Sequence, residues 1–64
     1  MHVVGKRRKD DRNGTLIYQP KVDGEWVANK ADAKVYASEA EANAKADRLN
    51  ILGGHFVYEA KPQV

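Results

Sequence analysis

A helix-start signal at Ser38 constrains the fold of this chain more than any other feature. The apolar run Val35–Tyr36–Ala37 ends at Ser38, and Glu41 follows three residues later. In this spacing the Ser38 hydroxyl accepts a hydrogen bond from the backbone N–H of Glu41, and the Glu41 carboxylate accepts one from the N–H of Ser38. The pattern is a capping box. It predicts that a strand ends and a helix begins at this point.

The predicted helix runs from the Ser38 cap to about Asn50. Glu41 and Lys45 lie one turn apart, in the favourable order, on its solvent side. Gly53–Gly54 tolerates left-handed backbone and ends the helix or the turn that follows it. Three apolar residues at helical spacing predict the buried stripe: Ala42, Ala46 and Leu49.

Short segments typical of β-strands lie on both sides of this helix. Asp23–Gly24 predicts a hairpin turn between Lys21–Val22 and Glu25–Ala28, and Asn13–Gly14 predicts another tight turn. Pro20 has no N–H for a ladder, which places it at an edge or a bulge. The predicted strands are His2–Arg7, Thr15–Gln19, Glu25–Ala28, a short Ala33–Tyr36 that continues the third or forms a fourth, and His55–Ala60.

The order of these segments predicts an α+β fold, with three to four antiparallel strands and one helix packed on one face of the sheet (β-β-β-α-β). Residues 1–64 form a single small domain, and the tail 61–64 is expected to be frayed. One helix covers one face, so the other face is expected to meet water or a partner. In the last strand Phe56, Tyr58 and Ala60 share a face.

Composition restricts the chemistry available to the chain. A domain of 64 residues has a thin core, with little room for a deep cleft that holds a catalytic acid and base. There is no cysteine and only two histidines, so no disulfide, metal site or cofactor is expected. No apolar run is long enough for a membrane span or a signal peptide. A non-enzymatic, cytoplasmic protein is the expectation.

A basic run, Lys6–Lys9, is followed by Asp10–Asp11 and Arg12, and the net charge of the chain is +2. One interpretation is a solvated hairpin loop, which the two aspartates favour. The other is a contact surface for phosphate or for an acidic protein. The exposed edge of the last strand is a second element that could dock on a partner.

Aromatic residues fall on or beside the predicted strands. If several shared the helix-free face with basic residues, they would form a stacking platform for single-stranded nucleic acid. If they point toward the helix, they form the core, which is the expectation for Trp26 and Phe56. The expected partner-binding residues are therefore Lys6, Arg7, Arg8, Lys9, Arg12, Tyr18 and Tyr58.

From Val35 to Val64 the chain resembles the small early phage proteins, of the kind encoded by phage T7, that inhibit the host RNA polymerase. The residues that carry the resemblance are Val35–Tyr36–Ala37, Glu41–Ala42, Ala46, Gly54, Phe56, Val57, Pro62 and Val64. The resemblance implies a non-enzymatic α+β protein that occupies the DNA-binding channel of the polymerase and sets arginines of its last strand against an acidic patch. Here the segment 55–59 contains no arginine, so basic contacts would come from Lys6–Lys9.

A looser likeness, carried by Gly24–Glu25–Trp26 and the helix after it, is to the three-stranded DNA-binding domains of phage integrases, which have no strand after the helix. The sequence therefore leads to a main hypothesis and an alternative. The main hypothesis is a phage or mobile-element protein, monomeric or weakly dimeric, that binds and inhibits a host macromolecule such as bacterial RNA polymerase in the host cytoplasm. The alternative is a small nucleic-acid-binding module that uses the basic hairpin and the sheet aromatics.

Overall fold

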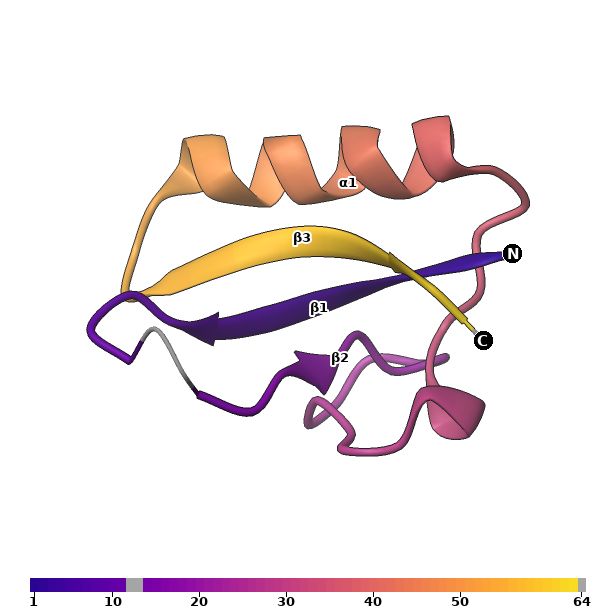
Figure 1. Ribbon diagram of the computed structural model, residues 1–64, viewed down its shortest axis with the longest axis horizontal. Helices are drawn as coiled ribbons and strands as arrows, with labels where there is room; N and C mark the ends of the chain where they lie inside the picture. Colours follow the sequence, from indigo (N-terminus) through magenta and orange to yellow (C-terminus); the bar gives the residue numbers. More distant parts are fainter. Residues whose placement is uncertain (12–13, 64) are drawn as a thin grey trace.

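The computed structural model describes residues 1–11 and 14–63 and shows a three-stranded antiparallel sheet with one α-helix packed against it (Figure 1). The strand order is β2-β1-β3, and α1 packs on β1 and β3. The predicted α+β class is confirmed. The elements are β1 His2–Arg8, β2 Ile17–Tyr18, the 3-10 helix η1 Lys30–Asp32, α1 Glu39–Leu52 and β3 Phe56–Pro62.

The helix begins and ends as its sequence predicts. The backbone N–H of Glu41 donates to Ser38 Oγ over 3.2 Å, which confirms Ser38 as the N-cap. The return bond from the Ser38 N–H to the Glu41 carboxylate is not among the hydrogen bonds of the described residues. Gly53 and Gly54 have φ angles of 79° and 107°, and residues other than glycine rarely adopt such positive values. The helix therefore stops at Leu52 for a local, steric reason.

β1 forms the centre of the sheet and is buried on both faces. Val4 packs with Ala42 and Ala46 of α1, and these residues form the core on the helix side. Val3, which points to the opposite face by strand alternation, is also fully buried. On that second face the Tyr18 ring lies so close to Gly5 that an added Cβ would meet it at 3.2 Å.

The expectation that the helix-free face is open is wrong at the middle of the sheet. The chain between β2 and α1 pairs with β1 and β2 through isolated backbone bridges on the β2 side of the sheet. Backbone bridges join Pro20 to Ala33 and His2 to Tyr36, and Ala33 is fully buried. Figure 1 shows this loop on the side of the sheet away from α1, and the full burial of Val3 means that this face is not open to solvent there.

The predicted strands between residues 15 and 36 are largely wrong. The second strand shrinks to Ile17–Tyr18, and the hairpin at Asp23–Gly24 does not form. Instead Val27 exchanges two backbone hydrogen bonds with Tyr18, at 2.7 and 2.9 Å. Because Val27 pairs with β2 rather than with Lys21–Val22, the residues between them bend outward as an exposed loop.

The C-terminal tail is also more ordered than expected. Lys61 and Pro62 belong to β3, and the Gln63 N–H donates to the Met1 carbonyl over 2.9 Å. The ladder with β1 therefore continues past the predicted end at Ala60. Of the predicted turn at Asn13–Gly14, Asn13 lies outside the described residues, as do Arg12 and Val64.

Candidate binding surface

The fully buried core contains only small side chains, and every described aromatic ring is half-buried. Ala42 and Ala46 let α1 lie close to β1 and β3, and the rings that pack against this small core, Trp26, Tyr36 and Tyr58, are not fully buried by it. The expectation that Trp26 and Phe56 form the core is therefore met only in part, since both keep a solvent-facing side. The buried residues are Val3, Val4, Gly5, Ala33, Ala42 and Ala46.

Three of these rings form an aromatic cluster, Trp26, Phe56 and Tyr58, on the helix side of the sheet. The ring centres of Trp26 and Tyr58 are 5.7 Å apart at an interplanar angle of 57°, and those of Phe56 and Tyr58 are 6.4 Å apart at 51°. These tilted contacts are the geometry that aromatic pairs prefer. Phe56 and Tyr58 share a face because they alternate along β3, as predicted, whereas Trp26 arrives from the loop after β2.

Lys6 points into this aromatic cluster. Its Nζ lies 4.5 Å from the centre of the Trp26 ring and 4.3 Å from that of Phe56. Cation–π contacts of this kind contribute about 0.5–1 kcal/mol each at exposed sites. Within residues 1–11 and 14–63 no carboxylate pairs with Lys6. The ammonium thus lies against two rings, and no carboxylate of the described residues neutralises its charge.

Beside Trp26 the surface is hollowed between α1 and the loop after β2. We call this feature the Trp26 hollow, and its volume is about 120 Å³. Lys45 lies on its helix wall, and the predicted pairing of Lys45 with Glu41 is absent from the ion pairs of the described chain. Val22, on the opposite wall, is 77% exposed. The residues that line the hollow are Gln19, Pro20, Val22, Asp23, Gly24, Trp26, Lys45 and Leu49.

The structure does not bring the predicted basic run together as one surface. Lys6, Arg7 and Arg8 belong to the end of β1 rather than to a solvated loop, so strand alternation sends them to opposite faces of the sheet. Arg8 Nε lies 3.4 Å from Asp10 Oδ1, and Lys9 is exposed at the strand end. Alternation places Arg7 on the opposite face of the sheet from Lys6 and Arg8. The positions of these residues in the sequence alone do not show that their charges are separated in this way.

The two tyrosines proposed as contact residues are both half-buried, but they lie on different faces. Tyr58 faces α1 and packs against the core, whereas Tyr18 lies opposite Gly5 on the far face. The Lys30 Nζ sits 5.8 Å from the centre of the Tyr18 ring. A stacking platform that contains both tyrosines is therefore not formed.

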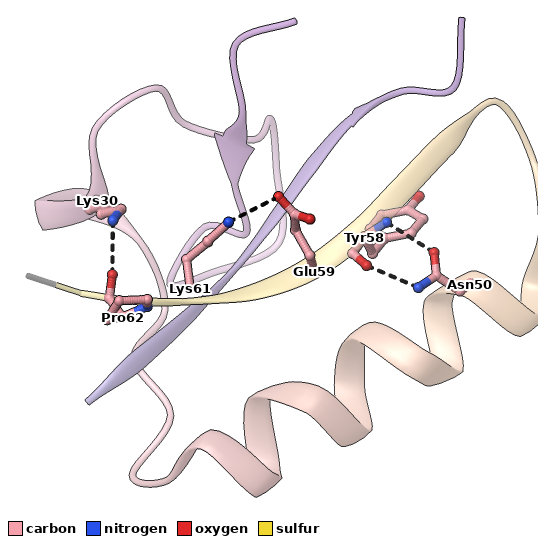
Figure 2. A network of polar contacts seen from close by, with 6 residues as sticks. All are labelled: Lys30, Asn50, Tyr58, Glu59, Lys61 and Pro62. Atoms are coloured by element: carbon pink, nitrogen blue, oxygen red, sulfur yellow. Dashed lines mark hydrogen bonds and ion pairs between the residues drawn. The ribbon is translucent and has the colours of Figure 1, made fainter. Parts of the chain in front are cut away.

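Side chains bond to the outer edge of β3 at two positions, Tyr58 and Pro62 (Figure 2). Asn50 Nδ2 donates to the Tyr58 carbonyl and the Tyr58 N–H donates to Asn50 Oδ1, both over 2.9 Å. Farther along, Lys30 Nζ donates to the Pro62 carbonyl over 2.8 Å, and Pro62 has no N–H to offer. These contacts occupy the outward N–H and carbonyl of Tyr58 and the outward carbonyl of Pro62, groups that an added strand would otherwise use. The edge is therefore partly capped within the monomer.

Two further observations limit the chemistry of the described chain. Residues 1–11 and 14–63 contain no group of three or more His, Cys, Asp or Glu side chains that could hold a metal ion. Across the same ranges, no helix has the length and apolar character that a membrane crossing requires.

Comparison of the chain with protein-family models, with curated proteins and with solved structures finds no match.

Proposed function

We propose that this chain is a non-catalytic binding protein that modulates a macromolecular partner by covering part of its surface. The observation that supports this most is the Trp26 hollow with the aromatic cluster beside it. Large apolar side chains that a small domain leaves half-exposed in one region are typical of protein interaction sites. Tryptophan at the centre of such a region is the residue type that most often dominates binding.

A bacterial RNA polymerase is the partner that we propose to test first. The resemblance over Val35–Val64 implies contact with an acidic patch of the polymerase, and β3 supplies no arginine for it. Lys6 and Lys45 supply positive charge beside the apolar surface instead, and neither pairs with a carboxylate in the described chain. The proposal includes a phage origin and action in the host cytoplasm.

Direct nucleic-acid binding is the competing hypothesis, and two structural observations disfavour it. The Lys6 ammonium lies over the Trp26 and Phe56 rings, where a base would have to stack. Tyr18 and Tyr58 lie on opposite faces, so they do not add to a common platform.

The experiment is a binding titration of the folded protein with purified bacterial RNA polymerase, together with transcription from a defined promoter. We expect saturable binding and reduced transcript. Absence of binding to the polymerase would remove it as the partner.

A parallel titration with single- and double-stranded DNA at two salt concentrations tests the competing hypothesis. Phosphate contacts make affinity fall steeply as salt rises. Salt-sensitive DNA binding that is lost in the double variant Arg8→Ala/Lys9→Ala would establish a nucleic-acid module instead.

A further inference from the structure

We propose that Asn50 and Lys30 cap the outer edge of β3 so that a second copy of this chain does not pair with it. The caps act at the sheet edge, away from any partner that the Trp26 hollow would contact, so they are independent of the function proposed above. Two observations support them: which backbone groups of β3 point outward, and which of those groups already have a hydrogen-bond partner.

β3 lies at an edge of the sheet, because it pairs with β1 and with no other strand of the described chain. At the ends of this pairing the Lys9 N–H donates to the His55 carbonyl and the Gln63 N–H donates to the Met1 carbonyl, both over 2.9 Å. Bonded pairs recur at every second residue of an antiparallel ladder, so the odd-numbered residues of β3 bond to β1. The residues whose backbone groups point outward are therefore Phe56, Tyr58, Ala60 and Pro62.

Capped positions alternate with free ones along this edge (Figure 2). Asn50 bonds both backbone groups of Tyr58, and Lys30 bonds the carbonyl of Pro62, which has no N–H. No hydrogen bond between described residues involves the outward groups of Phe56 or Ala60. No two neighbouring outward positions are free, so an added strand cannot form two successive pairs of bonds.

The Asn50 side chain is chemically suited to act as a cap. Its carboxamide carries one acceptor oxygen and an NH₂ donor, the same kinds of group that a residue of a neighbouring strand would present. It uses both on Tyr58, and it is held there because α1 packs on β3. Asn50 therefore replaces one residue of a paired strand.

Lys30 caps the edge from a separate element, η1. Its Nζ lies 2.8 Å from the Pro62 carbonyl oxygen and 5.8 Å from the centre of the Tyr18 ring. A lysine at a strand edge also opposes association, because two identical edges would bring like charges together. The two caps thus come from different parts of the chain and act on the same strand.

A second copy of the chain is the occupant that fits the uncapped edge. Two copies related by a twofold axis present the same strand to each other in antiparallel orientation. One such register places Tyr58 opposite Tyr58 and Phe56 opposite Ala60, and all of these residues have an N–H. Asn50 is the cap that lies within this register. Its removal frees three successive outward positions, which are Phe56, Tyr58 and Ala60.

Sedimentation velocity over a series of concentrations tests the proposal on the full-length protein. Asn50→Ala should raise the self-association constant about tenfold or more, the effect of roughly one or two additional hydrogen bonds. Lys30→Ala should raise it less, because Pro62 still lacks an N–H, and the double variant should associate most strongly. The matched controls Asn43→Ala and Lys21→Ala change exposed residues away from this edge and should behave like the wild type. Circular dichroism checks that each variant is folded.

A second measurement locates the contact and separates it from association caused by a loss of stability. In Asn50→Ala the N–H groups of Phe56 and Ala60 should become protected from hydrogen exchange as the concentration rises. A chemically synthesised Asn50→Ala chain with an N-methyl group on Ala60 lacks one donor that the second copy needs, and it should return to the monomer. The same N-methyl group in the wild-type sequence is the control, which should stay folded and monomeric because the Ala60 N–H has no partner in the described chain.

Three results would overturn the proposal. The first is an Asn50→Ala variant that is folded and as monomeric as the wild type. The second is association that persists with the N-methyl group, or that leaves Phe56 and Ala60 unprotected, because the contact would then lie elsewhere. The third is equal association in Asn43→Ala, which would make the effect independent of the Tyr58 bonds.

Discussion

Replacing Asn50 with alanine should lower the free energy of unfolding, because it removes the hydrogen bonds between α1 and the edge of β3. The Asn50 side chain makes two hydrogen bonds of 2.9 Å with the backbone of Tyr58, and it does so from an exposed position (Figure 2). Each such bond contributes about 0.5–1.5 kcal/mol net, so the pair contributes about 1–3 kcal/mol. Exposure to water favours the lower half of that range, because the freed Tyr58 groups can bond to solvent.

The substitution also changes helix propensity, which must be separated from the lost bonds. Alanine is favoured over asparagine in a helix by up to about 0.7 kcal/mol. Asn43 is a matched control on the same helix, since it is exposed and takes part in no side-chain hydrogen bond among the described residues. Asn43→Ala should be neutral or slightly stabilising. The difference in the free energy of unfolding between Asn43→Ala and Asn50→Ala isolates the two bonds.

Urea denaturation and thermal unfolding followed by circular dichroism measure this difference. For a domain of this size each kcal/mol corresponds to roughly 4–8 °C in Tm. The Asn50→Ala variant also frees the N–H and carbonyl of Tyr58 at the sheet edge, so sedimentation should show more self-association at high concentration. Equal stability of the two alanine variants would refute the reasoning, because it would mean that the Asn50 contacts contribute nothing.

Three further predictions concern the helix ends and one partly buried hydroxyl. Ser38→Ala should lower the free energy of unfolding by about 1 kcal/mol in denaturant titrations, with Ser38→Thr close to wild type, because the cap on the Glu41 N–H is lost. Gly53→Ala should cost about 1–2 kcal/mol, since φ is 79° while a Cβ would meet no neighbour, and unchanged stability would contradict the backbone explanation. Burial raises the pKa of Tyr36, although its hydrogen bond to Gln19 acts in the opposite direction. The folded state therefore holds this proton more tightly than the unfolded state, so stability should fall as pH rises above the ordinary tyrosine pKa of about 10, and Tyr36→Phe should reduce that fall.

The parts of the fold that local sequence signals control were predicted well. Ser38 caps the helix because its hydroxyl reaches an N–H three residues away, a distance that the chain itself fixes. Gly53 ends the helix because its φ angle excludes larger residues. The shared face of Phe56 and Tyr58 follows from strand alternation alone. Each of these depends on neighbours within about one helical turn.

The candidate surface could not be predicted in the same way. The sequence marked Lys6 as part of a basic run and Trp26 as a core residue. Neither signal shows that the Lys6 ammonium lies over the Trp26 ring. That contact joins residues far apart in the chain and depends on the path of the loop after β2. A weak signal was available, because the buried stripe of the helix is mostly alanine, and rings that pack against so small a core stay partly exposed.

The sequence by itself determined where the helix starts and stops, that strands flank it, and that the chain is a small α+β domain. The tertiary structure alone decided that Val3 is buried on the helix-free face, that Asn50 bonds to the β3 edge at Tyr58, and that Lys6 and Lys45 lie beside a half-exposed tryptophan. The physical reason is the range of the interactions. Caps, glycine turns and alternation are set by covalent geometry over a few residues, whereas these contacts require the whole chain to fold before the groups that make them can meet.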